Sequence, residues 1–199
     1  MRRLPLLALA LPAIGIALAL VPEPLRLAME YDHDALAAGE WWRAWSGHVV
    51  HFSARHAGVD LIAAFALAAA IEMRSGRRLL AAMLLCLPPL LSLSLNFGAP
   101  GLATYRGASG LCAAFGAALG LLLWQESAAT RAPLIALAGI FALKTLCEAT
   151  GFVANASGLS GAVRVVWQAH AFGAVFGLGA SVLRFRCIDR ASLPATRAA

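Results

Sequence analysis

Ser109 and His170 are the residues of this sequence whose types and surroundings point most directly to chemistry. Ser109 lies near the start of a stretch, residues 105–125, that carries no charge after Arg106. His170 lies in a second apolar stretch, and a histidine inside a membrane is costly to bury and is a functional candidate by default. A serine beside an imidazole is the arrangement of an activated nucleophile, in which the histidine takes the hydroxyl proton. The pair therefore suggests nucleophilic chemistry inside a bilayer.

Small residues accompany both candidates at helical spacing. They are Gly107, Gly110, Gly116 and Gly120 around and after Ser109, and Gly173 and Gly177 after His170. Stripes of small residues let two membrane helices approach backbone to backbone. We therefore expect the two apolar stretches to be neighbouring helices that bring the serine and the histidine together.

The composition indicates an integral membrane protein. Of 199 residues, 61% are hydrophobic and only 13% are charged, and the mean hydropathy is +0.77, which is far above that of a soluble domain. The net charge of +6 lies at helix ends and in loops, without a dense basic patch interleaved with aromatic residues. We therefore expect a lipid bilayer as a partner and no nucleic acid.

Six apolar runs predict an all-α fold of six transmembrane helices in a single domain, residues 1–199. The runs cover about residues 1–21, 54–71, 79–95, 108–124, 133–150 and 165–183, near the lower limit of spanning length. The first run also fits a signal peptide, but its retention would place both termini on the side that collects the arginines. We expect an outer first loop over about 22–53 and a loose C-terminal tail over about 189–199.

The arginines predict the orientation. Those on the side of the N-terminus are Arg2, Arg3, Arg74, Arg77, Arg78, Arg131, Arg184, Arg186, Arg190 and Arg197, and those opposite are Arg26, Arg43, Arg55, Arg106 and Arg164. The positive-inside rule therefore puts both termini in the cytoplasm. Residues 40–45, Glu-Trp-Trp-Arg-Ala-Trp, predict an amphipathic element at the outer interface, because indole rings prefer the headgroup level.

Depth in the membrane gives a test of the proposed pairing. Counted back from the cytoplasmic ends of three parallel helices, Ser109, His170 and Asp60 each lie at roughly 21–22 Å. His56 lies one helical turn nearer the outside. We therefore expect four polar side chains to converge on one layer, below the outer surface and above the middle of the bilayer.

At these residues the chain resembles the rhomboid family of intramembrane serine proteases. Residues 107–110 read Gly-Ala-Ser-Gly, which is similar to the family's Gly-x-Ser-Gly. Residues 169–177, with His170 second, are similar to its Ala-His-x-x-Gly-x-x-x-Gly. His51 and His56 have the family's spacing, Glu72 follows at the end of the same run, and the first loop holds a Trp-Arg pair.

The resemblance implies a serine endopeptidase that cleaves membrane-anchored protein substrates near the outer face without a metal or other cofactor. Ser109 would be the nucleophile and His170 the general base. The backbone N–H groups of Ala108 and Ser109, with His56, would stabilise the oxyanion. The short chain and the run from Gly39 to His48 further resemble a bacterial subgroup, the rhombosortases, which implies the inner (cytoplasmic) membrane, a multi-pass topology and substrates with a C-terminal Gly-Gly sorting tail.

Asp60 departs from the family pattern, which commonly has Asn four residues after the outer histidine. An ionised Asp cannot donate to an oxyanion, and its charge would oppose the developing negative charge. A carboxyl in a poorly solvated site can instead stay protonated and donate. Asp60 is therefore interpreted either as a neutral donor or as a residue that holds His56.

The polar residues also fit other functions. His48 and His51 could join His56 and Asp60 as metal ligands, but no ligand motif supports this. Lys144 and Glu148, four residues apart in one apolar run, are expected to neutralise one another as a structural pair. Two further functions remain as alternatives: a small transporter or channel that uses these ionisable groups as a relay, and a rhomboid-like binding protein without catalysis.

Overall fold

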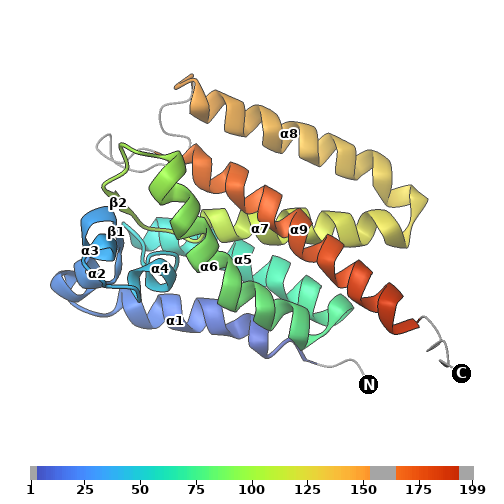
Figure 1. Cartoon of the computed structure of the whole chain (residues 1–199), viewed down its shortest axis with the longest axis horizontal. Coiled ribbons are helices and arrows are strands. Elements are labelled where there is room, and N and C mark those ends of the chain that lie inside the picture. The colour runs from blue at the N-terminus through green and yellow to red at the C-terminus, as the bar shows by residue number, and fades with distance from the viewer. Residues whose placement is uncertain (1–3, 153–164, 193–199) are drawn as a thin grey trace, which may run out of the picture.

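The computed structural model describes the backbone of residues 4–152 and 165–192 (Figure 1). Its longer helices are α1 (Ala10–Ala19), α5 (Ala54–Ser75), α6 (Arg77–Gly98), α7 (Ser109–Glu126), α8 (Arg131–Ala149) and α9 (Trp167–Ser192). Short 3₁₀ helices, Leu7–Leu9 and Ala128–Thr130, precede α1 and α8. The predicted all-α class is confirmed, since the described strands are two segments of two residues each.

Four of these helices are long and apolar enough to cross a bilayer, and they match four of the predicted runs. Within the described residues they are α5, α6, α7 and the Ala128–Ala149 segment that contains α8. The first apolar helix, Leu7–Ala19, is shorter, and α9 has the length but carries polar Gln168 and His170 in its first turns. The predicted number of six spans is therefore not confirmed.

The core lies where α5, α6, α7 and α9 meet, with α1 against α5 on one side (Figure 1). Alanines of α5 and α7 pack there against larger apolar side chains of α6 and α7. Its buried members include Ala64, Ala68, Leu80, Met83, Leu87, Leu91, Leu111, Ala114, Phe115 and Ala118. Glu72, at the end of α5, accepts hydrogen bonds from the backbone N–H of Ala8 at 2.8 Å and from Arg77 at 3.0 Å. The first apolar segment is thereby held against the bundle.

The first loop is folded into short elements. These are α2 (Glu23–Met29), β1 (Tyr31–Asp32), α3 (His33–Ala37) and α4 (Arg43–Ser46). Strand β1 pairs antiparallel with β2 (Thr104–Tyr105), with Tyr31 opposite Tyr105. The loop is therefore attached to the segment that enters α7.

The predicted amphipathic element at residues 40–45 is present only as the short helix α4. Around this helix, aromatic side chains are exposed and a charged side chain is buried. Trp41 and Trp42 are 67% and 51% exposed, whereas the Arg43 side chain is buried. Arg43 donates to the carbonyl oxygens of Leu27 and Glu30 and to the Glu40 carboxylate. The arginine thus satisfies backbone acceptors of the folded loop, while the indoles face outward.

Candidate active site

Ser109 is the first residue of α7, and its position depends on the turn that precedes it. Gly107 has φ of +132°, a conformation that favours glycine, and its N–H donates to the Gly47 carbonyl at 3.1 Å. A Cβ at Gly107 would lie 3.0 Å from the His56 imidazole, so the lack of a side chain also makes room for α5. Ala108 then caps the helix, and Ser109 is half-buried at its N-terminus.

His170 lies in the first turn of α9, beside the same end of α7. At Gly110 an added Cβ would lie 3.1 Å from the carbonyl oxygen of Ala169. Gly173 approaches the Gly110 carbonyl so closely that no Cβ would fit. Ser109 and His170, each adjacent in sequence to one of these contact residues, are therefore brought to the same end of the helix pair.

The small-residue contact continues down both helices, but on α7 it follows a different stripe from the predicted one. Gly177 packs against the Ala114 carbonyl, and Ser181 donates to the Ala118 carbonyl at 3.1 Å. Gly116 has no atom within 4 Å of an added Cβ. The packed face is thus Gly110, Ala114 and Ala118. The prediction that Gly116 and Gly120 continue the stripe is wrong, because positions i+6 and i+10 turn away from a face that repeats every four residues.

The helix α5 contributes Asp60 and His56 to the same place. The Asp60 carboxylate accepts a hydrogen bond from the Ala108 N–H at 2.8 Å. The same oxygen, Oδ2, lies 3.3 Å from Nε2 of His56 and 3.4 Å from Nε2 of His51. The predicted convergence of Asp60 and His56 on the start of α7 is therefore present. The Ala108 donor, which was expected to face an oxyanion, is bonded to a carboxylate instead.

The histidine of α9 has a carboxylate partner that the sequence interpretation missed. His170 Nδ1 lies 2.8 Å from Oε2 of Glu148, and Oε1 of Glu148 lies 2.5 Å from Nζ of Lys144. The predicted Lys144–Glu148 pair is thus present, but it extends across to α9. In the part of the chain that the structure describes, no hydrogen bond joins His170 to Ser109. An ionisable pair in an otherwise apolar helix was the available signal, since such residues are rarely only structural.

Two further buried groups surround the site. Burial is the main cause of a raised pKa of the Tyr105 phenol, on which Ser109 and Asp60 also act, so this phenol stays neutral. His48 is fully buried, with Nε2 at 3.1 Å from the Ser92 hydroxyl, and burial lowers its pKa to about 4. His48 therefore belongs to the packing between the first loop and α6, apart from the His51, His56 and Asp60 group.

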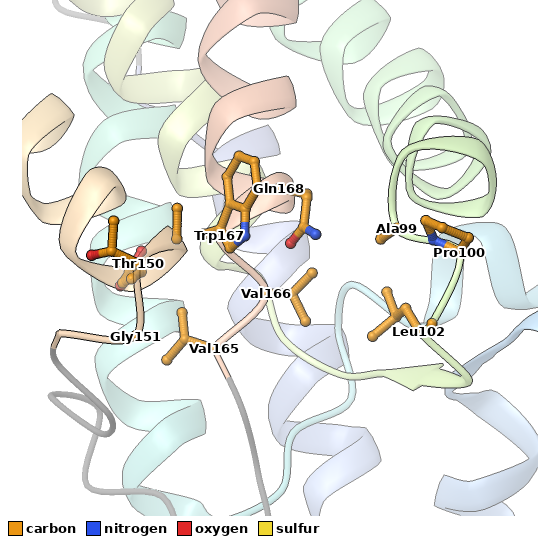
Figure 2. Close-up of a pocket in the computed structure, with 12 residues that line it drawn as sticks. Ala99, Pro100, Leu102, Thr150, Gly151, Val165, Val166, Trp167 and Gln168 are labelled. Carbon is orange, nitrogen blue, oxygen red and sulfur yellow. The ribbon is translucent and has the colours of Figure 1, made fainter.

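A pocket of about 590 Å³ is lined by Glu148, the partner of His170, and by the residues labelled in Figure 2. It lies between the end of α8, the start of α9 and the segment that follows α6. Its lining is Ala99, Pro100, Gly101, Leu102, Glu148, Ala149, Thr150, Gly151, Val165, Val166, Trp167 and Gln168. Glu148 is thus shared between the pocket and the hydrogen bond to His170.

A bundle of apolar helices thus holds a serine and a histidine at the same end of a small-residue helix contact, an arrangement of a membrane-embedded protein. The chain matches the Rhomboid domain over residues 38–187, which covers most of its length. The chain belongs to the rhomboid family, whose membership implies intramembrane serine proteolysis of membrane proteins. A comparison with curated proteins finds no match.

Proposed function

We propose that the protein is an intramembrane serine endopeptidase in which Ser109 is the nucleophile and His170 the general base. The observation that carries this proposal is the α7–α9 contact, in which Gly110 and Gly173 bring the two helix starts together. Ser109 attacks the scissile carbonyl while His170 takes its proton and then donates it to the leaving amine. Membership of the rhomboid family supports the same chemistry.

The oxyanion is stabilised at the N-terminus of α7. The Ser109 N–H and the His56 imidazole supply donors there, together with the Ala108 N–H when Asp60 releases it or shares it as a neutral acid. A charged Asp60 on the Ala108 donor would repel the developing negative charge. Catalysis therefore requires either a protonated Asp60 or a displacement of its carboxylate from the Ala108 N–H.

Substrates are membrane-anchored proteins cleaved near the outer face. A helical substrate shields its scissile bonds, so the segment must leave the helical conformation before Ser109 attacks. The pocket beside Glu148 and Gln168 offers such an extended segment, and water, a route to His170. The proposed setting is the bacterial inner membrane, with six spans that include Leu7–Ala19 and α9 and with both termini in the cytoplasm. A C-terminal alkaline phosphatase fusion that is active outside the cell would contradict this topology.

The narrower proposal is a rhombosortase, which removes C-terminal Gly-Gly sorting tails. It rests on the run from Gly39 to His48 and on the short chain. A membrane-anchored reporter with a Gly-Gly tail should be cleaved, and the same reporter with Ala-Ala should not. Equal cleavage of both would leave the protease assignment standing and remove the subgroup.

Labelling with a fluorophosphonate probe tests the reaction itself, because the probe reacts with activated serines. The parent protein should be labelled, and the Ser109→Ala and His170→Ala variants should not. Ser127, which caps the 3₁₀ helix Ala128–Thr130, provides a matched control on the same chain, since Ser127→Ala should leave labelling unchanged. Labelling that survives Ser109→Ala would exclude Ser109 as the nucleophile.

A further inference from the structure

We propose that Glu148 is the positioning residue of the dyad, holding His170 in the tautomer that accepts the proton of Ser109. This inference rests on the proposed function and adds a third member to it. Its carboxylate reaches His170 from α8, a helix that carries neither of the two catalytic residues. Glu148 acts through His170 and does not touch the scissile bond.

The geometry determines where the imidazole proton lies. An ionised carboxylate only accepts hydrogen bonds, so the 2.8 Å contact between Oε2 of Glu148 and Nδ1 of His170 places the proton on Nδ1. In the neutral ring Nε2 then carries a lone pair. That lone pair is the base that Ser109 needs, and the same carboxylate stabilises the imidazolium that forms when the proton arrives.

Lys144 binds the other oxygen of this carboxylate, so Glu148 bridges two partners. Its ammonium lies 2.5 Å from Oε1 of Glu148 but 3.5 Å from Nδ1 of His170, so the carboxylate is the closer partner of both groups. The Lys144 side chain is 49% exposed, whereas the side chains of Glu148 and His170 are 6% and 7% exposed. The lysine thus neutralises an otherwise buried charge from the edge of the site.

A purely structural pair does not explain this arrangement. A Glu–Lys pair four residues apart satisfies itself along the helix face, and with the lysine half-exposed it contributes little to stability. No residue of α8 is buried, so packing does not force the Glu148 side chain inward. It is nevertheless almost fully covered, and its second oxygen bonds His170, the proposed general base.

The test replaces Glu148 with glutamine, because an amide can either donate a hydrogen bond to Nδ1 or accept one from it. In Glu148→Gln, Lys144 attracts the amide oxygen, which turns the NH₂ group toward Nδ1 and moves the ring proton to Nε2. We expect kcat on a membrane-anchored reporter to fall by about 10²–10⁴-fold, as for a triad carboxylate replaced by its amide. KM should change by less than about twofold, since the substrate contacts remain. Thr145→Val, on the same helix but with its hydroxyl donating to the Phe141 carbonyl, should change neither constant by more than about twofold.

A second substitution distinguishes tautomer control from loss of structure. In Lys144→Met with Glu148→Gln no ammonium competes for the amide oxygen, which then turns to accept from Nδ1–H. The double variant should recover at least about tenfold in kcat over Glu148→Gln alone, because the reactive tautomer returns. A double variant no more active than Glu148→Gln would overturn the proposal, and so would a Glu148→Gln variant with parental kcat.

A proton NMR signal tests the bond without relying on activity. The Nδ1–H proton of an imidazole bonded to a carboxylate resonates far downfield, and it should appear in the parent protein and in Ser109→Ala. It should be absent from His170→Ala and Glu148→Gln. The charged groups that act on His170 are Lys144 and Glu148 on α8 and Asp60 on α5, so Asp60→Asn checks that the signal survives changes on α5. A signal that persists in Glu148→Gln would overturn the proposal. If the parent protein shows this signal but does not cleave the reporter, the result counts against the proposed function alone.

Discussion

The α7–α9 pair and the helix α8 are opposite ways of placing a functional group in this molecule. Along α7 and α9, small residues bring the two backbones into direct contact at Gly110 and Ala114, and the Ser181 hydroxyl bonds the Ala118 carbonyl one turn further on. Helix α8 lies at the edge of the bundle, against α9, and none of its residues is buried (Figure 1). Its hydrogen-bond contribution to the site is the contact from Glu148 to His170.

The difference teaches which parts of the site are fixed by packing. Ser109 and His170 stand next to backbone contacts that leave no room for adjustment, since interiors packed at this density transmit even a one-carbon change. The apolar side chains of α8 instead face outward, as suits a helix surrounded by lipid. The two catalytic candidates are therefore held by the core, whereas the partner of His170 is held by electrostatics.

The largest expected effect concerns Ser109 and His170, at the closely packed contact between α7 and α9. Ser109→Ala and His170→Ala should each abolish cleavage of a membrane reporter, because the two residues act as one unit and either loss removes the whole contribution. Both variants should remain folded, which gel filtration in detergent would check. Near-normal cleavage by either variant would contradict the assignment of the dyad.

The next effect concerns Asp60, which joins α5 to the N-terminus of α7. Asp60→Ala should lose roughly 2–4 kcal/mol of transition-state stabilisation if the carboxyl donates to the oxyanion. Asp60→Asn should keep substantial activity, since the amide is a permanent donor.

The pH profile separates Asp60 from His170. A neutral Asp60 donor loses activity as rising pH ionises it, whereas a general base gains activity as it deprotonates. The falling limb should therefore disappear in Asp60→Asn. An unchanged profile in Asp60→Asn, together with normal activity in Asp60→Ala, would leave Asp60 a role in holding His56 or in packing.

The buried contact between the first loop and α6 predicts sensitivity to acid. Burial lowers the pKa of His48 from 6.5 to about 4, so the folded protein keeps this ring neutral where the unfolded chain would bind a proton. The stability it contributes is complete above pH 6.5 and is lost as the pH falls toward 4, by about 3 kcal/mol in total. The melting temperature in detergent should therefore fall less between about pH 7 and pH 4.5 in His48→Asn than in the parent. Equal falls would show that His48 is not buried as a neutral group.

A single added carbon should distinguish the two regions most directly. Gly177→Ala drives a methyl group into the Ala114 carbonyl and should destabilise the protein by about 1–3 kcal/mol. Gly179 on the same helix and Gly139 on α8 have open space at an added Cβ. Alanine at either should be neutral or stabilise by about 0.5–1 kcal/mol, because helical glycine carries an entropic penalty. Equal thermal stability of the three variants would refute the difference in packing.

Much of the helical framework could be predicted from the sequence because apolar length and helix-ending residues are local properties. The runs at 54–71, 79–95, 108–124 and 133–150 correspond to α5, α6, α7 and α8, each within a few residues. The meeting of Asp60 with the start of α7 followed from equal depth on parallel helices. The small-residue stripe on α7 was predicted wrongly, because spacing identifies which residues share a helix face but not which face meets a partner helix.

By itself the sequence determined that the protein is a membrane protein of the rhomboid family, and it singled out Ser109, His170, His56 and Asp60 as the candidates for chemistry. Only the tertiary structure decided that Asp60 accepts from Ala108, that Arg43 turns inward, and that Glu148 reaches across to His170. The physical reason is that hydropathy and motif spacing are read along one chain. A hydrogen bond between side chains depends on the distance and rotation of two helices, which packing sets only when the whole bundle forms.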